Sequence, residues 1–243
     1  MIAIMNLGPN LYRIGNDKVA VHLVATDDGM TLIDAGLPGQ YRDLQQELAA
    51  IGRRSQDIRG IVLTHGDSDH IGFAERLRAE LGVPVYVHAA DAARARGEEK
   101  SKPAWGKIKV GPTASFLTYG MRKGAMRTAP LTVVEAVDDG AVLPLPGEPR
   151  VIGLPGHSPG SVAVHAPTVR AVFVGDALTT RNVLTGAQGP QPAPFTDEPD
   201  TATTSLERLA ELDVDWVIPG HGPAWRGGVP ALLDAYRAAA RTA

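Results

Sequence analysis

Hydrophobic and polar positions follow two repeats along this chain, one typical of strands and one typical of helices. Short apolar runs rich in Val and Ile predict strands at residues 19–26, 30–33, 58–63, 83–87, 131–134, 151–154, 161–165, 171–174 and 216–218. Leucines and alanines at helical spacing predict helices at residues 40–51, 71–81, 89–96, 203–212 and 229–241. Strands therefore alternate with helices in both halves of the chain.

Residues 97–130 break this alternation, because they show no clear period and hold several Gly, Pro and Lys. We predict a long loop there, with one or two helical turns. No linker or low-complexity tract divides the 243 residues, so we expect one domain, residues 1–243, with a basic loop insertion at about 97–130. A chain of this length can bury a sizeable core.

The composition excludes several kinds of site. Without cysteine the chain has no disulfide, thiolate ligand or cysteine nucleophile, so a zinc site must use His and carboxylates. The net charge of −3 gives no sign of nucleic-acid or membrane binding. The apolar part of the first ten residues is too short for a signal peptide, and no run approaches the length of a transmembrane helix. We therefore expect a cytoplasmic protein.

Four apolar strands end in the same way, with a histidine or an aspartate directly after the strand and one or more small residues. These four residues are His65, His157, Asp176 and His221. A rigid strand followed by a small residue can aim a ligand at a fixed point. Four such strand ends predict one shared site at one edge of the sheets.

The densest group of such side chains is the segment Thr64-His65-Gly66-Asp67-Ser68-Asp69-His70. His65, Asp67 and Asp69 are two residues apart, so in an extended loop they can point to one side, while His70 turns elsewhere. One loop could thus serve two neighbouring metals, with His65 and Asp67 at one and Asp69 and His70 at the other. The simpler alternative is that Asp67 or Asp69 caps the following helix.

Together these motifs resemble those of the metallo-β-lactamase superfamily. The first motif of that family, His-x-His-x-Asp-His, is followed by a Gly-His, an Asp and a final Gly-His. This chain has counterparts in the same order at residues 64–70, 156–157, 175–176 and 220–221. Leu32-Ile33-Asp34-Ala35-Gly36 resembles its early strand–turn motif, in which the aspartate supports the metal loop.

The resemblance implies a four-layer αβ/βα sandwich with two divalent metal ions between the sheets. One ion would take His65 and His157, with Asp67 left open, and the other would take Asp69, His70 and His221, with Asp176 bridging both. A hydroxide between the ions would attack an ester, lactone, thioester, amide or phosphoester. Asp69 would be the catalytic residue that orients the hydroxide and passes its proton to the leaving group.

Position 67 departs from the family pattern, because Asp stands where His is usual. We expect zinc, but a third carboxylate makes the site harder, which shifts the metal preference toward iron or manganese and keeps these two metals as the alternative. The flavodiiron branch has Glu at this position, which leaves an iron-dependent oxidoreductase as the second function. A non-catalytic metal-binding module is the third, and it is disfavoured because Asp69 and Asp176 are both retained.

Residues 94–127 carry a net charge of +7, which departs from the balance of the rest of the chain. The basic residues are Arg94, Arg96, Lys100, Lys102, Lys107, Lys109, Arg122, Lys123 and Arg127, against Glu98 and Glu99. A loop over the metals could steer an anionic substrate, with Trp105, Phe116 and Tyr119 in its apolar wall. The interpretation that we favour is a solvated loop or a dimer contact. We expect a small-molecule substrate, no nucleic acid and no membrane partner, with a homodimer left open.

Overall fold

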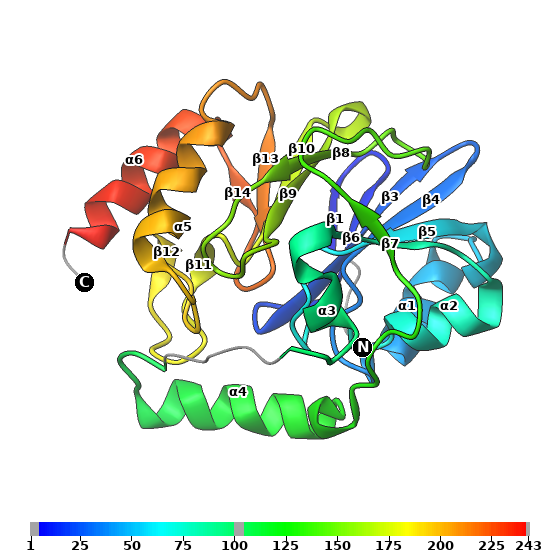
Figure 1. The fold of residues 1–243 in the computed structure, drawn as a ribbon, viewed down its shortest axis with the longest axis horizontal. Coiled ribbons are helices and arrows are strands. Elements are labelled where there is room, and N and C mark those ends of the chain that lie inside the picture. The colour runs from blue at the N-terminus through cyan, green and yellow to red at the C-terminus, as the bar shows by residue number, and fades with distance from the viewer. Residues whose placement is uncertain (1–4, 100–104, 242–243) are drawn as a thin grey trace.

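Two β-sheets face each other in the computed structural model, which describes residues 5–99 and 105–241 (Figure 1). The first sheet has its strands in sequence order: β1 (Met5–Gly8), β2 (Leu11–Asn16), β3 (Val19–Thr26), β4 (Gly29–Ile33), β5 (Ile58–Val62), β6 (Val85–His88) and β7 (Glu135–Val137). The second has the order β14 (Trp225–Arg226), β13 (Trp216–Pro219), β10 (Ala171–Gly175), β9 (Val162–Ala166) and β8 (Arg150–Gly153). A separate hairpin pairs β11 (Thr179–Arg181) with β12 (Gln188–Gln191).

Helices cover the outer face of each sheet (Figure 1). On the first sheet lie α1 (Gln40–Ala50), α2 (Ala74–Leu81) and α3 (Ala92–Ala95), the last continuing a 3-10 turn at Ala89–Asp91. On the second lie α5 (Pro199–Ser205), extended by a 3-10 turn at Leu206–Leu209, and α6 (Gly228–Ala240). These layers confirm the four-layer αβ/βα sandwich.

Three buried apolar clusters hold these layers together. One packs α1 and α2 on the first sheet, one fills the space between the sheets, and one packs α6 on the second sheet. Strand β3 is buried on both faces because Leu23 belongs to the first cluster and Val24 to the second. This explains why six of its eight residues are apolar, His22 and Thr26 being the exceptions, rather than every second one.

The last strand of the first sheet differs from its prediction. Residues 131–134 are not a strand, and β7 begins at Glu135. Leu131 is buried in the cluster beneath the helices, whereas Val133 is exposed. The apolar run therefore serves as a buried anchor before the strand, which apolarity alone does not distinguish from a strand.

The predicted loop at 97–130 contains a helix, α4 (Val110–Arg122), of thirteen residues. It lies along one side of the molecule beneath both halves (Figure 1). Only Thr113 is buried in it, and its hydroxyl donates to the carbonyl of Leu184 at 2.8 Å. Thirteen residues span more than three helical turns, so the prediction of one or two turns was wrong. No helix in the described part of the chain is long and apolar enough to cross a membrane.

Candidate metal centre

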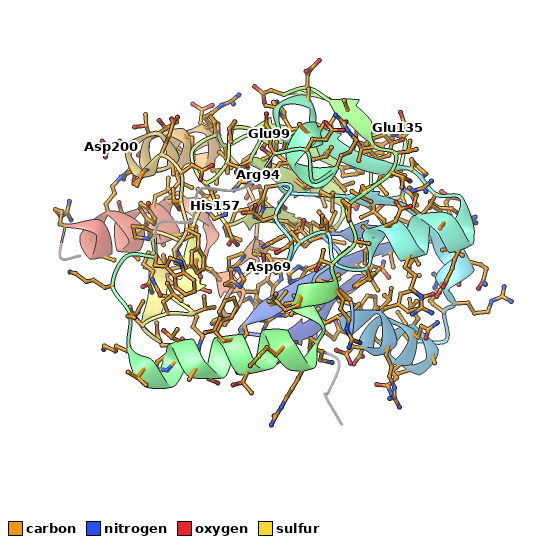
Figure 2. The ribbon with its side chains drawn as sticks, turned by 60° about the horizontal axis from the view of Figure 1, so that its bottom comes forward. Asp69, Arg94, Glu99, Glu135, His157 and Asp200 are labelled. Atoms are coloured by element: carbon orange, nitrogen blue, oxygen red, sulfur yellow. The ribbon has the colours of Figure 1, made fainter. Side chains whose placement is uncertain are left out.

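The ends of β5, β8, β10 and β13 meet at one edge of the two facing sheets. His65, His157, Asp176 and His221 follow these strands within four residues, as predicted. All four are buried. Figure 2 shows His157 and Asp69 in the middle of the molecule, between its two halves.

The structure brings six of the seven sequence-predicted residues into two adjoining groups. In each, three potential ligand atoms lie within 4.8 Å of one another: His65, Asp67 and His157 form the first group, and Asp69, His70 and His221 the second. The seventh residue, Asp176, forms a further group of this kind with His65 and His70, one histidine from each of the first two groups. Asp67 Oδ2 lies 3.6 Å from His65 Nε2 and 3.4 Å from His157 Nε2. Asp69 Oδ2 lies 3.5 Å from His221 Nε2.

Asp176 stands between the two groups. One of its oxygens lies 3.0 Å from His221 Nε2 and 3.9 Å from His157 Nε2, and the other lies 3.6 Å from His70 Nε2. The glycine before His221 makes this approach feasible. A Cβ on Gly220 would stand 2.5 Å from the His70 ring and 2.7 Å from Asp176 Oδ1, so a larger residue would push the two groups apart.

Three atoms in this cluster have no hydrogen-bond partner although they are buried: His65 Nε2, His70 Nε2 and Asp176 Oδ1. A buried polar atom without a partner costs on the order of 1–3 kcal/mol, so such atoms rarely stand together without a reason. Imidazole nitrogens and carboxylate oxygens are the donors that divalent metals accept where thiolate is absent. The side chains present therefore fit a metal site.

Each of the four histidines has its other ring nitrogen, Nδ1, against a hydrogen-bond acceptor. His70 Nδ1 meets the Asp34 carboxylate at 2.9 Å, and His221 Nδ1 meets the carbonyl of Lys18. His65 Nδ1 lies 3.1 Å from the hydroxyl of Thr64 and His157 Nδ1 lies 3.3 Å from that of Thr196.

Both hydroxyl groups donate their own proton to another acceptor. Thr64 donates to Asp34 at 2.9 Å, and Thr196 donates to the carbonyl of Ala193 at 2.9 Å. Each hydroxyl oxygen is thus free to accept a proton from the neighbouring Nδ1. The network favours the Nδ1–H tautomer in all four rings and leaves each Nε2 lone pair for the centre.

Asp34 supports the metal loop, as expected from its motif. It accepts from the backbone nitrogen of Thr64 at 2.8 Å, from the Thr64 hydroxyl and from His70. Its φ of 59° is in the left-handed region, which aspartate tolerates better than most residues. The sharp turn after β4 thus brings one carboxylate beneath two candidate ligands.

Asp91, which sequence reasoning missed, joins two of the loops that carry candidate ligands. It is fully buried and accepts hydrogen bonds from Gly66 N at 2.8 Å, Ser158 Oγ at 2.7 Å and Gly160 N at 2.7 Å. Gly66 follows His65, and Ser158 follows His157. In the sequence Asp91 lies within the short helix predicted at residues 89–96, so nothing local indicates this role.

The comparison that decides the family covers most of the chain. The sequence profile of the metallo-β-lactamase superfamily matches residues 14–221. The chain belongs to this superfamily.

Two relatives from Bacillus subtilis agree with this assignment. The chain is 30% identical over 211 residues to the probable metallo-hydrolase YflN of Bacillus subtilis, covering 83% of this chain and 78% of that protein. It is 27% identical over 211 residues to the probable metallo-hydrolase YqgX of the same species, covering 86% and 88%. Family and relatives together identify the chain as a metallo-hydrolase.

Solved structures share the fold of this chain. A metallo-β-lactamase family protein of Thermus thermophilus, TTHA1429, matches with a TM-score of 0.68 at 24% identity, over 94% of this chain and 78% of that one. A B3 metallo-β-lactamase described as having an active-site glutamic acid matches with a TM-score of 0.68 at 22% identity, over 98% and 88%. At these identities the likeness shows the fold alone.

The side chain at position 67, where the superfamily usually has histidine, is held by Arg94. Arg94 Nε donates to Asp67 Oδ1 at 2.6 Å, and Nη1 donates to Asp197 at 2.8 Å. Figure 2 shows Arg94 beside His157. Neither Asp67 nor Asp69 caps a helix, because α2 begins only at Ala74 and its first turn has no side-chain cap. The capping alternative is therefore wrong.

The carboxylates of the centre raise the pKa of the histidines in the second group. Burial lowers the pKa of His70, but Asp34 and Asp176 outweigh it and raise the value to about 10. Burial also opposes protonation of His221, yet Asp176 raises its pKa. His65 shows the reverse, because burial and the neighbouring histidines hold its pKa well below the usual range. Negative charge is thus concentrated around His70 and His221.

The basic residues in the segment 94–127 have different partners. Arg94 is turned inward, Arg96 pairs with Glu98 at 2.7 Å, and Lys123 pairs with Asp43 at 2.5 Å. Lys100 and Lys102 lie outside the described residues. The charge of this segment is therefore not one free surface, which corrects the interpretation as a single solvated loop.

Helix α4 nevertheless brings part of the segment against the centre. The Phe116 ring lies edge-on to His221, with ring centroids 6.1 Å apart. Arg122 and Tyr119 line a cavity of about 310 Å³ together with Lys18, whose carbonyl holds His221. The ring contact therefore places Phe116 next to the candidate ligand His221.

Proposed function

We propose that this chain is a binuclear metal-dependent hydrolase that cleaves an ester, lactone, thioester, amide or phosphoester bond in a small molecule. The observation that carries the proposal is the pair of adjoining three-residue groups with Asp176 between them. Three buried atoms of this cluster lack a protein partner. His65, Asp67 and His157 would hold one metal, Asp69, His70 and His221 the other, and Asp176 would contact both.

Divalent metals in these positions would act as Lewis acids and bring the pKa of a bound water toward neutrality. The chain supplies orientation and proton transfer. Asp69 is the most exposed of the seven side chains, at 24%, whereas His65 and His70 are at 1%. Its carboxylate can therefore meet a water or substrate from the open side, accept a proton there and deliver it to the leaving group. The acceptors at Nδ1 keep the four rings from turning.

Two cavities beside the centre support a small substrate with an anionic part. The larger, of about 540 Å³, has Trp105 and Phe195 in its wall and includes Thr196, which contacts His157. Its size suits a small organic molecule. The smaller, of about 310 Å³, is lined by Lys18 and Arg122 with the hydroxyl groups of Ser115, Thr118 and Tyr119.

Neither Lys18 nor Arg122 pairs with a carboxylate among residues 5–99 and 105–241. The Tyr119 hydroxyl is buried, and this burial raises the pKa of Tyr119 to about 12. It therefore stays a neutral donor at physiological pH. Two cations and three hydroxyl groups in one cavity would bind a carboxylate or phosphate group of the substrate.

The test is metal analysis combined with a hydrolysis screen. Protein purified without added metal is analysed by mass spectrometry, then loaded with zinc, manganese or iron and assayed on lactone, thioester, phosphodiester and β-lactam substrates. We expect two metals per chain and turnover of at least one substrate class that disappears on chelation. Metal-loaded protein that hydrolyses none of these classes would contradict the proposal.

An iron-dependent oxidoreductase remains the second candidate, because Asp67 adds a third carboxylate. The pairing of Asp67 with Arg94 weakens that argument, since the guanidinium offsets the added charge. A carboxylate in the active site is also compatible with hydrolysis on this fold, given the B3 metallo-β-lactamase with an active-site glutamic acid. Oxygen consumption by the iron-loaded protein, without hydrolysis, would favour this second function.

A further inference from the structure

The two groups of candidate ligands differ in their contact with fixed cations. In the first group Arg94 donates to both oxygens of Asp67, at 2.6 Å from Nε and at 3.3 Å from Nη2. In the second group Asp69 makes no ion pair with a lysine or arginine within the described ranges, and the same holds for Asp176. Arg94 is 6% exposed at its side chain, so water screens its charge weakly.

Arg94 makes the Asp67 carboxylate a weaker ligand for a metal. Asp67 Oδ1 is taken by the guanidinium, and only Oδ2 faces His65 and His157. That oxygen is itself shared with Arg94 Nη2. A divalent cation in the first group must compete with the guanidinium for one oxygen and is repelled by it at close range. Asp197, which binds Arg94 Nη1, offsets only part of this repulsion.

The second group is richer in negative charge for two further reasons. Asp176 lies 3.0 Å from His221 and 3.6 Å from His70, but 3.9 Å from His157. His70 also donates to the charged carboxylate of Asp34, which makes its Nε2 a stronger ligand. The histidines of the first group have neutral hydroxyls behind them.

We propose that Arg94 makes the two metal positions unequal, so that a divalent metal fills the Asp69, His70 and His221 position first. The His65, Asp67 and His157 position then fills only at higher metal concentration. The inference rests on the proposed binuclear centre. Arg94 acts through Asp67 as a positioning residue, and it does not touch the metal itself.

The order of filling is measured without any substrate. The full chain is equilibrated with chelator-buffered zinc over a range of free concentrations, and native mass spectrometry counts the metals bound. We expect a singly loaded form over at least about a tenfold range of free zinc, the size of effect that groups behind metal ligands usually have. The His221→Ala variant should lose the tighter step, and the His157→Ala variant should lose the weaker step while keeping the tighter one.

The role of Arg94 is tested by changing its charge and its shape separately. Arg94→Met should increase the zinc affinity of the weaker binding step by about tenfold. The range of free zinc concentration over which the chain holds a single ion should then become narrower. Arg94→Lys keeps the positive charge and should preserve the order. Arg96→Met, two residues away and paired with Glu98 at the surface, removes one arginine without touching the centre and should change neither step. Circular dichroism of each variant confirms folding.

The possible outcomes distinguish this inference from the proposed function. If the chain binds no zinc, both the proposed binuclear centre and the proposed order of filling are wrong. Two zinc ions that load together in the parent chain, or a tighter step that survives His221→Ala, leave a binuclear centre but contradict the order. A folded Arg94→Met with an unchanged or weaker second step removes Arg94 as the cause. If Arg94→Met does not fold, the parent chain and the histidine variants still decide the order, and Arg94→Lys must keep it.

Discussion

Asp69 is the residue on which the proposed chemistry depends most directly. Changing Asp69 to Asn keeps the shape of the side chain but removes the charge that accepts a proton. We expect Asp69→Asn to fold and to bind at least one metal, while turnover falls by about 10²-fold or more. The measurement is kcat at saturating metal on the substrate found by the screen, with metal content determined on the same sample. Turnover near that of the parent would exclude Asp69 as the proton acceptor.

The candidate ligands could be predicted from the sequence because each stands close to a segment that is clearly predicted as a strand. His157 and His221 follow apolar strands after a glycine, and the structure places both in the cluster. The roles of Arg94 and Asp91 could not be predicted in this way. Their partners lie far away in sequence, and a salt bridge or buried carboxylate across such a distance leaves no periodic pattern.

At the scale of elements, Asp91 ties the start of α3 to the loops after β5 and β8. Asp91→Ala would leave three buried donors without an acceptor, so we expect a loss of about 3 kcal/mol or more in the free energy of unfolding. Urea denaturation of the metal-free chain measures it. The control is Asp200→Ala, which removes an exposed carboxylate from the first turn of α5 and should change stability little. Equal stability of the two variants would contradict the role given to Asp91.

The smaller cavity, lined by α4 and Lys18, should make the chain prefer anionic over neutral substrates. With a matched pair of esters, one bearing a carboxylate and one neutral, we expect a higher kcat/KM for the charged ester. Lys18→Gln or Arg122→Gln should reduce this preference by about tenfold, since each removes one charge-assisted contact, while the neutral ester is unaffected. Arg127→Gln changes the same net charge outside the cavity and serves as the control. An unchanged preference in both cavity variants would mean that α4 does not bind the substrate.

The helix itself shows a limit of sequence patterns. Gly111, Pro112 and Gly120 weaken a helical prediction, and the apolar side chains of the helix, such as Leu117 and Met121, are exposed rather than packed in a core. Its place is set by contacts with the loop around Leu184, including the bond from Lys109 N at 2.9 Å. Such contacts are formed only after both segments have folded onto the sheets.

For the whole molecule, the charge of the centre makes metal binding depend on pH. His70 has a pKa of about 10 and is therefore protonated at pH 7 in the metal-free chain, and the pKa of His221 is raised as well, so His221 keeps its proton to a higher pH than an ordinary histidine. A metal binds only the neutral ring, so binding must release these protons and must weaken as pH falls. We expect up to about tenfold lower affinity per pH unit for each proton released. Calorimetry in buffers of different ionisation enthalpy counts the protons, and zero release would contradict these pKa shifts.

The four-layer sandwich explains why the centre lies where it does. Strands β4, β5 and β6 run parallel in one sheet and β10 and β13 run parallel in the other, so their carboxyl ends open at one edge between the sheets. The family resemblance implied these layers, whereas the apolar pattern predicted most of the strands and helices that form them, because most strands are buried and most helices carry one apolar face. The seven side chains meet there only because two sheets face each other.

The most direct test of a binuclear centre is anomalous X-ray diffraction from crystals of the zinc-loaded chain, recorded on both sides of the zinc absorption edge. We predict two anomalous peaks, one among His65, Asp67 and His157 and the other among Asp69, His70 and His221, both within bonding distance of Asp176. A single peak at saturating zinc, or peaks away from these side chains, would contradict the account.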